Sequence, residues 1–311
     1  MPTPIEKLAI VESELNRIIR GKADVIRHLL TALVAGGNVL LDDVPGVGKT
    51  TLAKALARLV DAKFNRIQFT PDLLPADITG TSIYNPSTGQ FQFRKGPVFT
   101  NILLADEINR ASPRTQSALL ECMCEHQVSP DGTTRFLEAP FMVIATQNPI
   151  EYQGTYPLPE AQLDRFAMRL SLGYPDEEAE REMLYDRRHI DPLDSLKPEI
   201  SCEEVLSLQA DMKKVGMEAS VSAYLLTIVQ STRHDARLTL GASPRAAIRL
   251  ADCSRALALI CGREFVLPDD VRELAPLVLS HRIVVDAKTR YAGVSAQEII
   301  AEIIHNTKLP L

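Results

Sequence analysis

Residues 40–50 read LLDDVPGVGKT, which is the most informative segment of the chain. Its last three residues, Gly48-Lys49-Thr50, match the end of the phosphate-binding loop pattern G-x-x-x-x-G-K-[ST]. Asp43, however, stands where that pattern has its first glycine. In such a loop, backbone N–H groups surround a phosphate at a helix N-terminus. The first glycine mainly serves the exit from the strand, where a short turn-forming aspartate also fits. We therefore expect phosphate contacts from Pro45, Gly46, Val47, Gly48, Lys49, Thr50 and Thr51.

The residues on either side of the loop support this interpretation. NVLLDD, residues 38–43, has the apolar run of a buried strand, and TLAKALARLV, residues 51–60, has the spacing of an amphipathic helix. A strand, a glycine loop and a helix in this order are the context that the motif requires. The alternative, a glycine-rich turn with a chance lysine, does not account for the helix that follows.

Strand-like and helix-like segments alternate through the first half of the chain. We expect strands at 38–43, 64–69, 101–107, 140–148 and 165–173, and helices within 1–35 (broken near Gly21), at 51–60 and at 113–126. This alternation predicts an α/β fold with a parallel sheet covered by helices. Two further segments, 82–96 and 127–138, contain the turn clusters of β-hairpins.

The pattern changes after residue 175. Residues 176–189 have the composition of a charged helix, and every long segment from about 200 to 305 has helical periodicity. We expect an α/β core at residues 1–190 and an all-α lid domain at residues 191–311. The boundary is expected near 188–198, in a segment with two prolines.

Composition narrows the range of functions. The chain has 311 residues, 45% of them hydrophobic, so it can bury a proper core. Its formal charge of −6 argues against bulk nucleic-acid binding. We see neither an apolar run of membrane-spanning length nor a signal-peptide pattern at the N-terminus. From the sequence we expect a cytoplasmic protein.

Polar side chains end two of the expected strands. NILLADE, residues 101–107, ends in Asp106 and Glu107, and FMVIATQN, residues 141–148, ends in Asn148. Ligands of parallel sheets lie at the carboxyl ends of the strands. We expect Thr50 and Asp106 to hold Mg²⁺, and Glu107 to orient or deprotonate an attacking water. We expect Asn148 to hold that water against the γ-phosphate.

Two arginines are candidates for stabilising the charge on a transferred phosphoryl group, because guanidinium matches phosphate oxygens. Arg165 follows PEAQLD just before the last expected strand, at the rim of the core. Arg245 follows Ser243 and Pro244, which predict a helix start, so it lies in the first turn of a lid helix. A lone arginine in either place would more often be a surface or ion-paired side chain.

In this order the motifs closely resemble those of the MoxR family of AAA+ ATPases, over nearly the whole chain. The resemblance is carried by LLDDVPGVGKT, FTPDLLPADITG, KGPVF, LLADEINRASPRTQSALLE, VIATQNPIEYQGTYPLPEAQLDRF, GASPRA and VLSHRI. It implies ATP bound between the subunits of a homo-oligomeric ring, usually a hexamer. Many relatives are chaperone-like ATPases that mature or activate other complexes, and their partners often carry von Willebrand factor A domains.

The resemblance also implies a role for each candidate. By this resemblance, Lys49 and Thr50 belong to the Walker A motif, and Asp106 and Glu107 belong to the Walker B motif. Asn148 corresponds to sensor 1. Arg165 becomes the arginine finger that reaches a neighbour's γ-phosphate, and Arg245 becomes sensor 2, which acts in its own subunit. Ile19 and Gly21 align with the segment that lines the adenine pocket. The 82–96 hairpin corresponds to the helix-2 insert, and 127–138 to the hairpin before sensor 1.

Other functions share parts of this pattern. A nucleotide-regulated scaffold with little turnover would need neither Glu107 nor Arg165. A nucleic-acid-directed ATPase shares the core motifs, but the acidic charge and the lack of an appended nucleic-acid module argue against it. A GTPase is disfavoured because the sequence has no N-K-x-D segment for reading guanine. The leading hypothesis is an ATP-hydrolysing motor that remodels protein partners.

Overall fold

The computed structural model describes residues 2–148, 155–175, 177–178, 180–181 and 192–310. Most of the expected charged helix at 176–189 lies outside these residues, as does the expected domain boundary at 190. Both remain predictions from the sequence.

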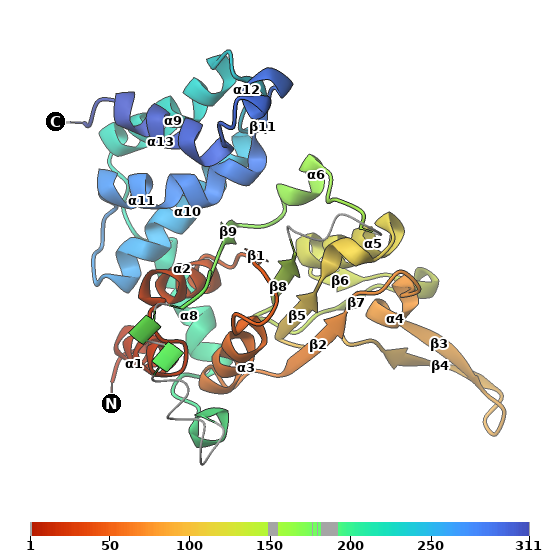
Figure 1. The fold of residues 1–311 in the computed structure, drawn as a ribbon. Coiled ribbons are helices and arrows are strands. Elements are labelled where there is room, and N and C mark those ends of the chain that lie inside the picture. Colours follow the sequence, from red (N-terminus) through yellow and green to blue (C-terminus); the bar gives the residue numbers. More distant parts are fainter. Residues whose placement is uncertain (1, 149–154, 176, 179, 182–191, 311) are drawn as a thin grey trace.

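The core contains a five-stranded parallel sheet in the order β2-β5-β8-β1-β9 (Figure 1). All five predicted strands are present, somewhat shorter than expected: β1 Val39–Asp42, β2 Phe64–Gln68, β5 Ile102–Asp106, β8 Met142–Gln147 and β9 Met168–Leu170. The register places Gln68 beside Asp106 and Asp42 beside Gln147. The carboxyl ends of neighbouring strands therefore meet at one edge of the sheet.

Each face of the sheet has its own apolar cluster, because side chains alternate along a strand. Leu41, Leu104 and Ile144 belong to a cluster with helices α1 Pro4–Ile18, α2 Ala23–Val34 and α3 Lys49–Leu59. Leu40 and Leu103 belong to a cluster with α4 Pro75–Thr79 and α5 Pro113–Glu125. The sheet is thus covered on both sides, which a parallel sheet requires.

Both predicted hairpins are present beside this sheet. The first pairs β3 Gly80–Asn85 with β4 Gln90–Lys95, and the second pairs β6 Gln127–Val128 with β7 Arg135–Phe136. The hairpins contact one another, since Ser82 Oγ donates to Asp131 and the Arg135 guanidinium lies 3.8 Å from the centroid of the Phe93 ring.

The C-terminal region, residues 202–306, is called the lid below. Its helices are α8 Cys202–Met212, α9 Ala219–His234, α10 Pro244–Ile260, α11 Pro268–Leu279, α12 Ala287–Tyr291 and α13 Ala296–Asn306. The expectation of an all-α lid is corrected in one detail, because β10 Leu238–Leu240 and β11 Val284–Val285 pair as a short antiparallel ribbon. Both segments are too short to show periodicity in the sequence. In the part of the chain that the structure describes, every helix is too short or too polar to span a bilayer.

The lid is not packed as an independent body. Its helices α8 and α10 lie against α1 and α2 (Figure 1). Leu208 and Leu250 of the lid belong to the same apolar cluster as Leu29 of α2 and Leu41 of β1. A change in lid position would therefore disturb the packing on one face of the core.

A buried arginine fastens the lid to the chain before β9. The side chain of Arg282, in the short helix η4 Ser280–Arg282, is only 1% exposed. Its Nε donates to Asp164 Oδ1 at 2.8 Å, and its other nitrogens donate to the backbone oxygens of Asp164, Phe166, Ala167 and Val278. His281 Nε2 donates to the Phe166 oxygen at 3.2 Å. Lid residues thus hold both neighbours of Arg165.

Asp43 does more than allow the chain to leave β1. Its carboxylate is buried and accepts three hydrogen bonds from the segment after β9. Ser171 Oγ and the Gly173 N–H donate to Oδ1 at 2.7 and 2.9 Å, and the Leu172 N–H donates to Oδ2 at 2.7 Å. This corrects the expectation that Asp43 is only a turn-forming residue, because its carboxylate joins two neighbouring strand ends.

We predict that Asp43→Asn lowers the free energy of unfolding by about 2–3 kcal/mol, because an amide nitrogen cannot accept from these donors. Nucleotide affinity should change less than about threefold, since the carboxylate is bound to residues 171–173 and Asp43 does not line the cavity beside the phosphate loop. Denaturant unfolding and fluorescent-nucleotide titration measure the two effects. An unchanged unfolding midpoint, or a tenfold change in affinity, would contradict this role.

We also predict that acid weakens the contact between His281 and the core. Burial, with a contribution from the charge of Arg282, holds the pKa of His281 well below its ordinary value. The unfolded chain therefore binds a proton at this histidine below about pH 6.5, while the folded chain does not, so stability falls as the pH falls.

Unfolding free energies at pH 7.5 and 5.5 should differ less in His281→Gln than in wild type. The exposed His305→Gln should behave as wild type. Equal pH slopes in all three proteins would refute the prediction.

Candidate nucleotide site

A cavity of about 360 Å³ opens at the carboxyl edge of the parallel sheet. Most of the candidate residues predicted from the sequence line this cavity, and so do two residues that were not predicted, Arg66 and Gln68. The lining residues are Pro45, Gly46, Gly48, Lys49, Thr50, Thr51, Arg66, Gln68, Asp106, Glu107 and Asn148.

The loop between β1 and α3 has the backbone that an anion site needs. Gly46 and Gly48 have φ angles of +89° and +97°, in the left-handed region where a side chain would be strained. Helix α3 begins directly afterwards, at Lys49, so its N-terminal N–H groups border the cavity. Lys49 Nζ donates to the backbone oxygens of Asp43 and Val44 at 2.7 and 3.1 Å. The lysine ammonium is thereby held over the loop.

The remaining expected nucleotide contacts lie just outside the cavity lining. The Val47 side chain packs against the apolar core, so only its backbone belongs to the loop. A Cβ atom at Gly48 would lie 3.6 Å from Ile19 Cδ1, which places Ile19 beside the phosphate loop. Gly21, with φ of +69°, lies between α1 and α2. An adenine contact for Ile19 and Gly21 remains a prediction.

Both strand-end acids are already engaged by neighbours. Asp106 Oδ1 accepts from Thr146 Oγ1 at 2.6 Å, and Oδ2 accepts from Arg66 Nη2 and Nε at 2.6 and 3.1 Å. Glu107 Oε2 accepts from Gln68 Nε2 at 2.7 Å and from Arg110 Nη1 at 2.9 Å. The two acids therefore have different cationic neighbours.

The backbone at Glu107 is unusual, with φ of +56° in a residue other than glycine. Its N–H donates to Thr146 Oγ1 at 2.9 Å, which fixes the turn at the end of β5. Such strained positions are often retained where a side chain must be aimed. Glu107 and Asp106 both line the cavity as a result.

The oxygen atoms in this cavity suit a small hard cation. The Thr50 hydroxyl and the Asp106 carboxylate border the same space, and Mg²⁺ is usually held by one or two such groups together with water and substrate phosphates. Among the described residues, no group of three or more histidine, cysteine, aspartate or glutamate side chains could form a metal cage. The residues present fit Mg²⁺ that arrives with a nucleotide.

Asn148, at the end of β8, is buried and lines the cavity as expected. The two candidate arginines do not line it. Arg165 Nη1 donates to the Leu120 oxygen of α5 at 2.8 Å. Arg245 is in the first turn of α10, with Ser243 as N-cap as predicted, but its side chain is 67% exposed and its Nη1 lies 3.9 Å from Asp164 Oδ2. Within one chain, neither arginine reaches the phosphate loop.

Sequence reasoning missed Arg66 and Gln68, although a signal was present. In FNRIQF the two polar residues flank the buried Ile67, so they share one face of a strand. That strand pairs with the one that ends in Asp106. Polar alternation beside an acidic strand end could therefore have indicated them.

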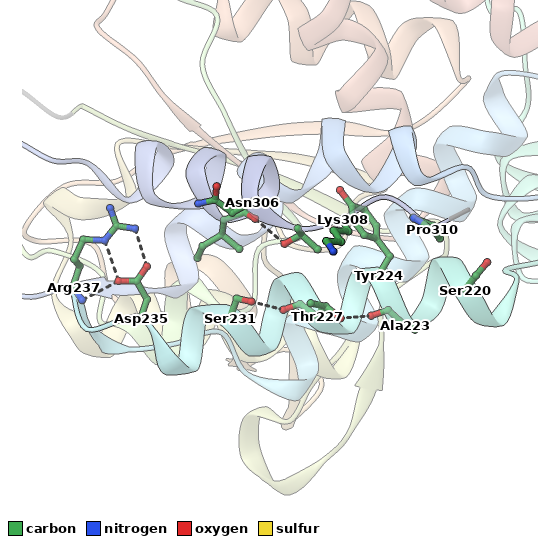
Figure 2. Close-up of a pocket in the computed structure, with 12 residues that line it drawn as sticks. Ser220, Ala223, Tyr224, Thr227, Ser231, Asp235, Arg237, Asn306, Lys308 and Pro310 are labelled. Carbon is green, nitrogen blue, oxygen red and sulfur yellow. Dashed lines mark hydrogen bonds and ion pairs between the residues drawn. The ribbon is translucent and has the colours of Figure 1, made fainter.

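A larger cavity, of about 670 Å³, lies in the lid between α9 and α13 (Figure 2). Small polar residues of α9 form one wall, and Lys308 and Pro310 lie opposite. Asp235 and Arg237 at one end are paired with each other at 2.8 Å. The described residues that line this cavity include neither the ends of the five parallel strands nor the glycine loop, so size alone does not identify the nucleotide site.

Two family models match parts of this chain. Residues 38–168 match the ATPase family associated with various cellular activities (AAA), and residues 230–303 match the AAA lid domain. The phosphate loop, both strand-end acids, Asn148 and Arg165 all fall within the first match, and Arg245 falls within the second.

Full-length relatives are similar over almost the whole chain. The protein is 49% identical to the uncharacterized protein YeaC of Bacillus subtilis over 297 residues. This alignment covers 96% of this chain and 93% of YeaC. It is 42% identical to Chaperone MoxR1 of Mycobacterium tuberculosis, with 96% of this chain and 81% of MoxR1 covered. A crystal structure of an ATPase candidate from Cytophaga hutchinsonii superposes with a TM-score of 0.91 at 40% identity, covering 99% and 96% of the two chains. The chain therefore belongs to the MoxR family of AAA+ ATPases.

Proposed function

We propose that this chaperone-like ATPase uses ATP hydrolysis to remodel, mature or activate partner protein complexes, and that its ATP sites are shared between the subunits of a ring. One observation carries the proposal. The phosphate loop, both strand-end acids and Asn148 line one cavity, whereas Arg165 and Arg245 lie outside it. A single chain thus holds the parts that bind ATP and activate water, but lacks a guanidinium from either candidate arginine.

The arrangement divides the chemistry among named groups. Lys49 and the N–H groups at the start of α3 hold the phosphates, and Thr50 and Asp106 would hold Mg²⁺. Bound there, Mg²⁺ would neutralise charge on the phosphate oxygens. Glu107 acts as the base toward water, and Asn148 positions that water.

The proposed ring would supply the missing guanidinium. Arg165 lies in the turn before β9, at the edge of the core, and lid residues hold its neighbours Asp164 and Phe166. From this edge it would reach the γ-phosphate of an adjacent subunit. Arg245 would act on the nucleotide of its own subunit after closure of the lid. We propose a hexameric ring, as in the family at large.

The partners are proposed by analogy with relatives. One relative is named Chaperone MoxR1, and a chaperone role favours protein substrates here. Proteins with von Willebrand factor A domains are the first candidates. A passive scaffold is disfavoured, because Glu107 is held at the cavity in a strained backbone conformation that nucleotide binding alone does not need. A nucleic-acid-directed ATPase is disfavoured by the net charge of −6. A cytoplasmic location remains a prediction from the sequence.

Glu107→Gln should retain ATP binding and lose turnover by about 10²-fold or more, the scale of general-base catalysis. The amide still accepts a hydrogen bond from Gln68, so the local structure should survive. Lys49→Ala should instead weaken nucleotide binding, and the exposed Glu125→Gln serves as the matched control. Phosphate release and fluorescent-nucleotide binding give the two readouts. A normal hydrolysis rate in Glu107→Gln would remove Glu107 from the role of base.

Arg165→Ala subunits should bind ATP normally but hydrolyse it on the order of 10³-fold more slowly, because every site lacks its incoming guanidinium. Mixing them with Lys49→Ala subunits should restore activity at mixed interfaces, since those subunits still offer Arg165. Arg290→Ala, at an exposed lid arginine, is the control. Full activity in a demonstrated monomer, or no rescue at any mixing ratio while both variants remain folded, would count against a shared site.

A further inference from the structure

We propose that Arg66 competes with the metal ion for Asp106, so that metal binding is disfavoured until a nucleotide is present. The proposal rests on the proposed metal-binding role of Asp106. It assigns a function to a residue that lines the nucleotide cavity and belongs to none of the motifs described above.

The contact between the two side chains is close and directed. Two nitrogens of the Arg66 guanidinium, Nη2 and Nε, donate to the same carboxylate oxygen, Asp106 Oδ2, at 2.6 and 3.1 Å. The Asp106 side chain is 12% exposed, so water screens this ion pair less than an exposed one. Strand pairing between β2 and β5 fixes the separation of the two residues.

The other oxygen of Asp106 is also engaged. Oδ1 accepts from Thr146 Oγ1 at 2.6 Å, and Thr146 is fully buried and accepts in turn from the Glu107 N–H. This side of the carboxylate is fixed by neutral groups in the core. The side that faces Arg66 is therefore where a cation would approach, and a second positive charge there is repelled by the guanidinium.

Arg66 can leave Asp106 without leaving the site. Its side chain is 46% exposed and borders the cavity together with Lys49. A triphosphate bound in this cavity would bring several negative charges close to both side chains. Gln68 Oε1 accepts from Arg66 Nη2 at 2.9 Å and steadies the guanidinium in its present place. Nucleotide phosphates thus offer Arg66 another anion, and they also offer the metal the oxygen ligands that one carboxylate and one hydroxyl do not supply.

The test uses metal alone, with no nucleotide, so that binding to phosphate does not enter. Mn²⁺ is titrated into the full-length protein and followed by electron paramagnetic resonance. Arg66→Met should bind Mn²⁺ about three- to tenfold more tightly than wild type, the scale of one partly exposed ion pair. Arg66→Lys keeps the cation and should stay within about twofold of wild type. Arg94→Met removes an equal charge from the exposed hairpin and should also leave Mn²⁺ affinity unchanged.

A double-mutant cycle with Asp106→Asn assigns the effect to this pair. If Arg66 acts through Asp106, the gain in affinity from Arg66→Met should vanish in the Asp106→Asn background. Unchanged or weaker Mn²⁺ binding in Arg66→Met, including no detectable binding, would overturn the proposal. A gain that persists without Asp106 would overturn it as well.

Mg²⁺-dependent ATP hydrolysis by wild type and Asp106→Asn, measured in parallel, separates two kinds of failure. If hydrolysis needs both Mg²⁺ and Asp106 while Arg66→Met binds Mn²⁺ as wild type does, then only the role of Arg66 is wrong. If hydrolysis is indifferent to Asp106, then the proposed metal site itself is wrong.

Discussion

The parallel pairing of β2, β5, β8 and β1 is the constraint on which the rest of the site depends. Parallel strands end at one edge, and the register brings Gln68 level with Asp106 and Asp42 level with Gln147. Residues far apart in the sequence therefore meet beside the N-terminus of α3. The phosphate loop shares its cavity with Asp106 and Glu107, at the end of β5, and with Asn148, after β8, because these neighbouring strands end at the same edge.

A second link joins the lid to the turn before β9. The carboxylate of Asp164 accepts from the buried Arg282 and lies 3.9 Å from Arg245, while the next residue is Arg165. The lid therefore holds the backbone on both sides of Arg165 by hydrogen bonds from Arg282 and His281. Because interiors are closely packed, movement of the lid and movement of this turn are linked. In the proposed ring, closure of the lid over one nucleotide would therefore also move Arg165 at the neighbouring ATP site.

The sequence predicted the sheet, both hairpins and most of the cavity lining, because hydrophobic periodicity and the glycine loop are local signals. It missed features that depend on long-range contacts. The three donors to Asp43 come from residues 171–173, and the acceptors of Arg282 come mainly from residues 164–167. The contact between Arg66 and Asp106 can be inferred only once β2 is known to lie beside β5. The β10–β11 ribbon joins two short segments of the lid that show no pattern on their own.

We propose that the nucleotide binds in one cavity, at the carboxyl edge of the sheet. A crystal structure with Mg²⁺ and a non-hydrolysable ATP analogue tests it most directly. We expect phosphates against the N–H groups of residues 46–51 and the Lys49 side chain, with the metal beside Thr50 and Asp106. Nucleotide bound instead in the larger lid cavity between α9 and α13, or phosphates that do not touch the loop, would contradict it.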